Sequence, residues 1–183
     1  MRFIIYDVET TGLDGTFDQI LQFAAVLADE DLREIDNFSV RCRRLPHVVP
    51  SPSALLATGL TPRDITDQPL SHYEMMLEVR RRLTDWSRGG AIFLGWNSIR
   101  FDESFLRQAY YQTLLPIFQT NTNGNSRGDV MRIAQACAIY APTRINVPTD
   151  DRGGPVFKLG EIAAANDVLL EHRTRLLPIH VQH

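Results

Sequence analysis

The sequence lacks any long apolar segment and has only two cysteines, Cys42 and Cys137. Its apolar runs fall far short of the roughly 20 residues that a membrane-spanning helix needs. The cysteines do not form a C-x-x-C pair, so we expect two free thiols in a reducing compartment. Met1 and Arg2 lead directly into Phe3 and an acidic segment, which is not the layout of a signal peptide. These absences predict a cytoplasmic protein.

A basic excess is also missing. The 183 residues include 19 Lys and Arg against 22 Asp and Glu, a formal net charge of −3. Because nucleic-acid-binding domains usually carry a basic excess, either nucleic acid is not the ligand, or bound metal ions and local basic patches offset an acidic site. Solvated surface explains both candidate patches slightly better than phosphate contact does. The patches are Arg41, Arg43 and Arg44, and Arg80, Arg81 and Arg82.

Hydrophobic patterning predicts one α/β domain, with a sheet whose faces carry helices and a site at the strand ends. Three strands with short connections, over residues 2–9, 20–28 and 34–42, form an antiparallel meander. A fourth strand is expected over residues 91–95. Helices are expected over residues 71–86, 102–111, 128–140 and 158–166, with short helices that start near Ser53 and Thr61.

Acidic residues at two predicted strand ends are the candidate chemical groups. Asp7 and Glu9 end the first strand, and residues two apart in a strand point to the same face. Their carboxylates repel each other, and a divalent cation removes that conflict because Mg²⁺ and Mn²⁺ prefer carboxylate oxygens. Asp102 follows the strand at residues 91–95 and starts a helix. The simpler explanations are exposed turn carboxylates for the pair and a helix N-cap for Asp102.

The segment Asp7-Val-Glu-Thr-Thr-Gly resembles the first motif of the DEDD-type 3′→5′ exonucleases, and Asn97-x-x-x-Phe-Asp resembles the second. The resemblance is greatest to the exonuclease I branch, which degrades single-stranded DNA from its 3′ end, and it extends over residues 1–167. An unrelated α/β domain with chance carboxylates is the alternative. Further matching segments are residues 22–25, 58–62, 129–132, 157–159 and 165–166.

The resemblance implies a ribonuclease H-like fold, in which the antiparallel meander and parallel strands form a mixed sheet with helices on both faces. It also implies hydrolysis of single-stranded DNA to mononucleotides at a two-metal site that holds Mg²⁺ or Mn²⁺. Asp7 would bridge both ions, Glu9 would bind one, and Asp102 would hold the second directly or through water. Within the family, RNA is the alternative substrate.

Nucleotide-binding residues are implied as well. The backbone from Thr10 through Thr11 to Leu13 would approach the terminal nucleotide, with Gly12 allowing that closeness. Leu13 and Phe101 would pack against bases, although packing in the core explains them at least as well. Asn97 would orient the site or simply hold its own turn. Gln22 would serve the site or be a buried, hydrogen-bonded glutamine.

The third motif of the superfamily is missing. That motif is a histidine followed five residues later by an aspartate on the final helix, and His172, His180 and His183 have no such partner. We therefore divide the chain into an exonuclease domain, residues 1–167, and an atypical tail, residues 168–183. A catalytically silent nucleic-acid-binding form of the family is the second hypothesis. The surface that a missing helix exposes would favour a homodimer.

A frameshift near Glu171 would explain the tail. In a reading frame one base later, the third base of the Arg173 codon and the next two bases can encode His. The third base of the Pro178 codon and the next two bases can encode Asp, five codons further on. Resequencing the gene tests this hypothesis, and an intact gene with no longer homologous reading frame would contradict it.

Overall fold

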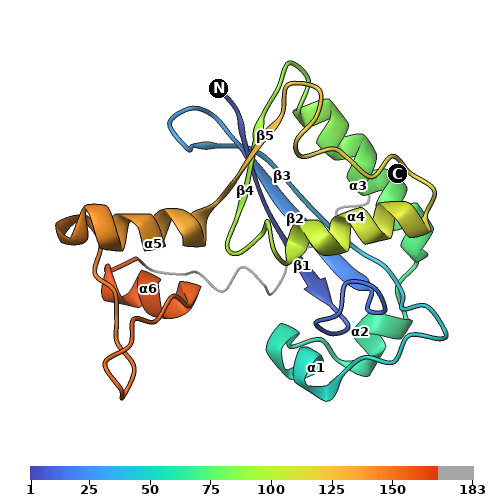
Figure 1. Cartoon of the computed structure of the whole chain (residues 1–183). Coiled ribbons are helices and arrows are strands. Elements are labelled where there is room, and N and C mark those ends of the chain that lie inside the picture. The colour runs from blue at the N-terminus through green and yellow to red at the C-terminus, as the bar shows by residue number, and fades with distance from the viewer. Residues whose placement is uncertain (169–183) are drawn as a thin grey trace.

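The computed structural model describes residues 1–168, so the predictions for the third motif and the frameshift lie outside the described residues. A five-stranded sheet with strand order β3-β2-β1-β4-β5 forms its centre (Figure 1). β1, β2 and β3 are antiparallel neighbours, whereas β4 and β5 run parallel to β1. The predicted meander and mixed sheet are confirmed. The strands are β1 (Phe3–Thr10), β2 (Ile20–Ala28), β3 (Glu34–Arg41), β4 (Ile92–Gly95) and β5 (Ser126–Asp129).

Helices lie on both sides of the sheet, with α3 and α4 on one side and α5 and α6 on the other (Figure 1). α3 begins as predicted, because the Ser71 side chain accepts from the Glu74 N–H while the Glu74 side chain accepts from the Ser71 N–H. The helices are α1 (Pro52–Thr58), α2 (Pro62–Thr66), α3 (His72–Trp86), α4 (Asp102–Gln112), α5 (Val130–Tyr140) and α6 (Leu159–Ala165), with a 3₁₀ turn, η1 (Pro142–Arg144).

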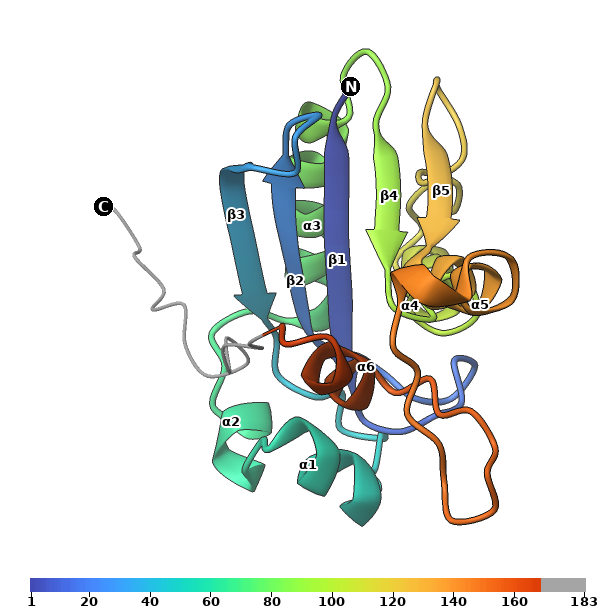
Figure 2. The same cartoon turned by 90° about the vertical axis from the view of Figure 1, so that its left-hand side faces the viewer.

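The main core lies between the sheet and the pair α3 and α4. Alternate residues of β1, namely Ile4, Tyr6 and Val8, belong to this core and are at most 5% exposed. The residues between them face the other way, where Ile5 keeps 39% of its surface exposed. Figure 2 shows this second face, with α6 in front of the end of the sheet at which β1 finishes.

The structure corrects one predicted boundary. Residues 128–140 were expected to form one helix, but Ser126–Asp129 form β5 and the helix begins at Val130. Only four residues with the sequence SRGD make this strand, and neither their polarity nor their glycine favours a strand. Pairing with β4 therefore decides their conformation, with Gly95 opposite Asp129.

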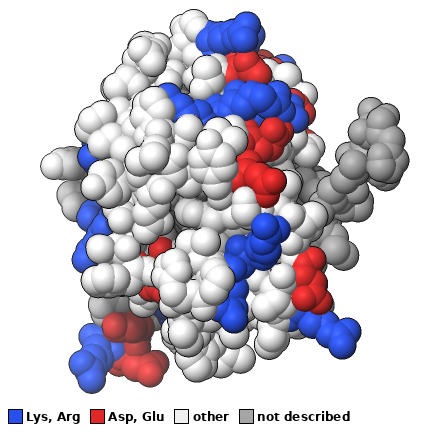
Figure 3. All heavy atoms as spheres, turned by 90° about the vertical axis from the view of Figure 1, so that its right-hand side faces the viewer, with Lys and Arg blue, Asp and Glu red and all other residues white. Residues whose placement is uncertain are grey.

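The arginines of α3 are engaged with nearby carboxylates or a carbonyl and do not form a free basic patch. Figure 3 shows the face of the molecule beside α3. Most of this face is uncharged, and its Lys and Arg side chains adjoin Asp and Glu side chains. Arg80 donates to the Pro116 carbonyl, Arg81 pairs with Glu78 and Asp85, and Arg82 pairs with Asp36.

Two further predictions concern helices and cysteines. None of the described helices is long and apolar enough to span a bilayer. Both cysteines are free thiols, as predicted.

Candidate active site

β1 directs Asp7 and Glu9 to the same face, because successive side chains of a strand alternate. Their neighbours Tyr6 and Val8 are buried in the core, 4% and 5% exposed. Packing of these two apolar residues therefore fixes the orientation in which both carboxylates face away from the core.

Asp102 reaches the same place from α4. Phe101 is the N-cap of this helix and makes no side-chain capping bond, so the N-cap explanation for Asp102 is wrong. The Asp102 side chain is only 2% exposed, and its Oδ1 accepts a hydrogen bond from the Val8 N–H at 3.0 Å. Its carboxyl group is also hydrogen-bonded to Asp7. The two motifs, far apart in sequence, thus meet at the end of β1.

The pKa values of all three carboxyl groups are raised. Burial and, secondarily, the charge of Asp7 raise the pKa of Glu9 to about 7, against the opposing charge of Arg41. Burial and the charge of Asp7 also raise the pKa of Asp102 to about 7, although backbone N–H groups donate to it. Partial removal from water raises the pKa of Asp7, opposed by its hydrogen bonds to Asp102 and the Val8 backbone. Such a group of carboxyls favours a bound proton or cation.

This donor set fits a divalent cation. Mg²⁺ and Mn²⁺ prefer oxygen ligands, and a cation relieves the repulsion that raises these pKa values. Asp7 and Asp102, joined by their hydrogen bond, are the best-defined part of the set, and Glu9 stands within electrostatic reach of Asp7. Among residues 1–168, no three His, Cys, Asp or Glu side chains are already gathered closely enough to surround a metal ion. Metal binding at this place would therefore require the carboxyls to move closer together.

The loop that follows β1 is held by its own polar side chains. Thr10 Oγ1 donates to the Gly12 carbonyl at 2.6 Å, and Thr11 Oγ1 donates to Asp18 Oδ1 at 2.8 Å. A Cβ at Gly12 would lie 2.3 Å from an Asp18 carboxylate oxygen, so a side chain here would displace Asp18 from its hydrogen bonds with Thr11 and the Asp14 N–H. Both threonines are buried, 5% and 0% exposed. Any contact of this loop with a nucleotide therefore falls to its backbone and its exposed side chains.

Two large apolar side chains project from this loop. Leu13 is 83% exposed, which contradicts the core explanation for it, and Phe17 is 78% exposed. Sequence reasoning missed Phe17, whose only signal is an aromatic residue inside a polar turn. Phe101 is different, because it is partly buried against the core with its ring centroid 4.9 Å from that of Phe105.

Asn97 holds the turn that leads to Asp102. It adopts a left-handed conformation with φ 57°, which asparagine tolerates better than most residues. Its carbonyl accepts from the N–H groups of Arg100 and Phe101, at 3.2 and 3.0 Å. The turn-forming explanation for Asn97 therefore has direct structural support.

A polar row crosses three strands beside the carboxylates. Glu9 lies opposite Gln22 on β2, which lies opposite Arg41 on β3. Arg41 Nε donates to Gln22 Oε1 at 2.9 Å, and the Gln22 amide donates to Ser39 Oγ at 3.0 Å. Gln22 is thus a hydrogen-bonded, half-buried glutamine that orients Arg41 on the face of the site. Arg41 belongs to the candidate basic patch that also includes Arg43 and Arg44. These two donate to backbone carbonyls, Arg43 to Pro69 and Arg44 to Leu45, Pro46 and Val48.

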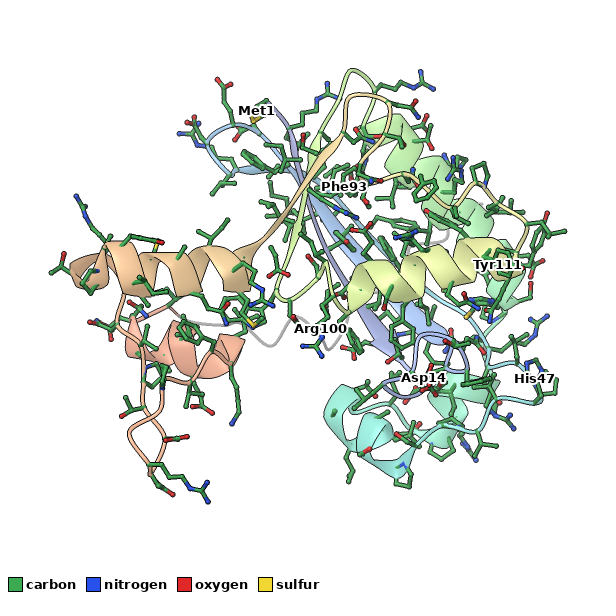
Figure 4. All side chains as sticks on the ribbon, in the orientation of Figure 1. Met1, Asp14, His47, Phe93, Arg100 and Tyr111 are labelled. Carbon is green, nitrogen blue, oxygen red and sulfur yellow. The ribbon has the colours of Figure 1, made fainter. Side chains whose placement is uncertain are left out.

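Arg100 is a second positive group that sequence reasoning missed. Figure 4 shows it at the turn before α4 and Asp14 on the loop after β1, both near the end of the sheet where β1 finishes. The Arg100 side chain is exposed and makes no hydrogen bond or ion pair within residues 1–168. Its position directly before Phe101 and Asp102 was the signal that could have identified it.

A model of the RNase T exonuclease family matches residues 4–140. The chain belongs to this family. Exonucleases of the family generally use divalent metal ions, in agreement with the carboxylates described above. The predicted resemblance to DEDD-type exonucleases is thus confirmed.

Curated relatives are named exodeoxyribonuclease I. The Haemophilus influenzae protein is 31% identical over 91% of this chain and 35% of its own length. The Escherichia coli protein is 29% identical over 91% of this chain and 35% of its own length. A crystal structure of Escherichia coli exonuclease I with a dT13 oligonucleotide has a TM-score of 0.86 at 28% identity, over 94% of this chain and 37% of that one. The ribonuclease H-like fold is confirmed, and the chain spans about a third of the length of these relatives.

Proposed function

We propose that residues 1–167 form a 3′→5′ exonuclease domain that hydrolyses single-stranded DNA to mononucleotides with Mg²⁺ or Mn²⁺. The observation that carries this proposal is the meeting of Asp7 and Asp102, whose carboxyl groups are hydrogen-bonded at the end of β1. In a chain of this family, the joined first and second motifs supply the part of the acidic centre for metal-dependent phosphodiester hydrolysis that the described residues contain. The dT13 complex of the Escherichia coli relative supports single-stranded DNA as the substrate.

In this proposal, Asp7, Glu9 and Asp102 hold the metal ions. Bound ions would activate the attacking water and stabilise the departing 3′-oxygen. The side chains of Leu13 and Phe17, both exposed on the loop after β1, contact the terminal bases through their apolar surface. The positive groups beside the acidic centre, Arg41 and Arg100, bind backbone phosphates of the DNA strand that enters the site. Such local positive charge explains how a chain of net charge −3 binds nucleic acid.

The second candidate function is a nucleic-acid-binding form of the family without catalytic activity. It is favoured by the missing histidine and aspartate of the third motif and by the incompletely gathered metal ligands within residues 1–168. In this form the first and second motifs still bind a cation, but water has no general base. The two candidates therefore share metal binding and differ in hydrolysis.

Release of nucleotides from 3′-labelled single-stranded DNA, with Mn²⁺ or Mg²⁺, tests both candidates. Asp7→Asn is the matched control because it removes the charge and preserves the shape of the side chain. Metal-dependent release that Asp7→Asn abolishes supports the exonuclease. Mn²⁺ binding that Asp7→Asn abolishes, without any nucleotide release by the unaltered chain, supports the silent form. A chain that binds no divalent cation contradicts both.

A further inference from the structure

Residues 97–103 carry Asp102 to the end of β1, and this segment needs support from outside itself. Asn97 has a left-handed backbone, and Phe101 caps α4 without a side-chain bond. Asparagine tolerates this conformation better than most residues, but the left-handed turn still needs contacts around it to hold it in one place. Whatever holds this segment therefore decides where the carboxylate of Asp102 lies.

Asp129 supports the beginning of the segment. Its Oδ1 accepts from the Asn97 N–H at 3.0 Å, and its Oδ2 accepts from the Ile99 N–H at 3.3 Å. Oδ1 also accepts from the Met131 N–H at 3.1 Å, which caps α5. The Asp129 side chain is 5% exposed, so these donors replace the water that its charge has lost.

Arg127 supports the end of the segment. It lies two residues before Asp129 on β5, and its guanidinium forms an ion pair with the carboxylate of Glu103. Glu103 is 2% exposed, and its Oε2 has no hydrogen-bond partner in the described part of the chain. The pair is thus buried on the Glu103 side, where removal of one partner leaves an uncompensated charge. The Glu103 N–H also donates to the Ser98 carbonyl at 2.8 Å.

We propose that Arg127 and Asp129 are positioning residues that fix Asp102 for metal binding. β5 fastens the segment at both ends, through two backbone N–H groups at the start and one carboxylate at the end. Asp102 can then accept from Val8 and meet Asp7 at the same time. The effect on metal affinity rests on the proposed function, whereas the effect on the Val8 hydrogen bond does not.

The first experiment measures amide hydrogen exchange by NMR in metal-free protein. Asp129→Ser is the key variant, because serine still caps α5 at Met131 but is too short to reach Asn97 and Ile99. We expect exchange at Asn97, Ile99 and Val8 to accelerate by about tenfold or more, while Met131 stays protected. Asp102→Ala gives the upper limit for Val8. Acceleration that is confined to Asn97 and Ile99 would overturn the proposal, since the loss of support would not reach Asp102.

The second experiment measures Mn²⁺ affinity by electron paramagnetic resonance without DNA. We expect Asp129→Ser and Arg127→Gln to weaken Mn²⁺ binding by about tenfold, the lower end of the loss that follows removal of a group bonded directly to a metal ligand, because both residues act on Asp102 through its segment. Arg127→Lys keeps the ion pair, so its Mn²⁺ affinity should stay close to that of the unaltered protein. Arg127→Gln leaves the charge of Glu103 buried without its partner. The double variant Glu103→Gln/Arg127→Gln removes that charge as well. It therefore shows whether Mn²⁺ affinity falls because the segment loses its support or because a buried charge is left unpaired.

Ser71→Ala is the matched control, since it removes a cap of α3, which packs on the core face of the sheet and not on the face of Asp7 and Glu9 (Figure 1). An equal loss of Mn²⁺ affinity in Ser71→Ala, or unchanged affinity in Asp129→Ser, would overturn the proposal. If the unaltered protein binds no Mn²⁺, the proposed function fails. Exchange at Val8 then decides on its own whether β5 positions Asp102.

Discussion

The Val8 N–H donates to Asp102 Oδ1 at 3.0 Å, and this bond links the two acidic motifs. β4 pairs with β1 only from Phe3 to Ile5, so the N–H of Val8 lies beyond the last paired residue of that ladder. The carboxylate of Asp102 takes the place of the backbone carbonyl that a longer β4 would offer to this N–H. One side chain thereby satisfies a buried backbone donor and is hydrogen-bonded to Asp7.

Asp102→Asn should separate the structural role of Asp102 from its metal-binding role. The asparagine oxygen can still accept from Val8, so we expect a melting temperature within a few degrees of the unaltered protein. Loss of the charge should weaken Mn²⁺ binding and nucleotide release by about 100-fold or more. Asp102→Ala also leaves the Val8 N–H unsatisfied, which costs about 1–3 kcal/mol of unfolding free energy. Thermal melts and Mn²⁺ titrations check this, and undiminished affinity in Asp102→Asn would contradict it.

Metal binding should become tighter as the pH rises from 6 to 8. Without metal, the pKa values of Glu9 and Asp102 are about 7, so a cation has to displace protons below that pH. Titration calorimetry in buffers of different ionisation enthalpy should detect proton release, with less release in Glu9→Gln. An affinity independent of pH, with no released protons, would be incompatible with these pKa values.

Stability without metal should depend on pH in the opposite direction. Glu9 and Asp102 have folded-state pKa values of about 7, above the roughly 4 expected for unfolded carboxyls. Their stabilising contribution is full below the unfolded value and is lost as the pH rises through the folded value. Melting temperature in EDTA should therefore fall between about pH 5 and 8, and less so in Asp102→Asn. A variant with the same slope as the unaltered protein would exclude Asp102 as the cause.

Arg100 should contribute to DNA affinity without contributing to stability. Its guanidinium is exposed and makes no hydrogen bond or ion pair with the described residues, two positions before Asp102. Arg100→Ala should weaken binding of single-stranded DNA, and the slope of log K against log salt should fall by about 0.7. Arg2→Ala removes an exposed arginine at the opposite end of β1 and is the matched control. Equal losses in the two variants would mean that net charge alone acts.

Strong local patterns made much of the fold predictable. β2 and α3 have the predicted ends because the apolar run of β2 before the acidic turn at Asp29 and the Ser71 and Glu74 capping pair are local signals. β5 could not be predicted, because the SRGD segment is a strand only through its pairing with β4. The dependence of a short polar strand on its neighbour is invisible to a local pattern.

The candidate site, like the fold, could be predicted only in part from the sequence. Motif spacing identified Asp7, Glu9 and Asp102, since residue type and order are properties of the sequence itself. Their connection could not be predicted, because the Val8 to Asp102 bond joins residues 94 positions apart. Exposure of Phe17 likewise depends on how the loop after β1 folds around Asp18.

Leu13 and Phe17 should bind the terminal bases of single-stranded DNA. They are 83% and 78% exposed on the loop after β1, where the buried threonine side chains are already engaged. Removing Phe17 should weaken binding by about 1–3 kcal/mol, because stacking of a base on an aromatic side chain is worth that much, and removing the aliphatic Leu13 should weaken binding less. Stability should hardly change, since neither residue packs in the core. Fluorescence anisotropy with labelled oligonucleotides checks Leu13→Ala and Phe17→Ala against Leu56→Ala, an equally exposed leucine on α1. If all three variants bind DNA as the unaltered protein does, this loop does not contact the substrate.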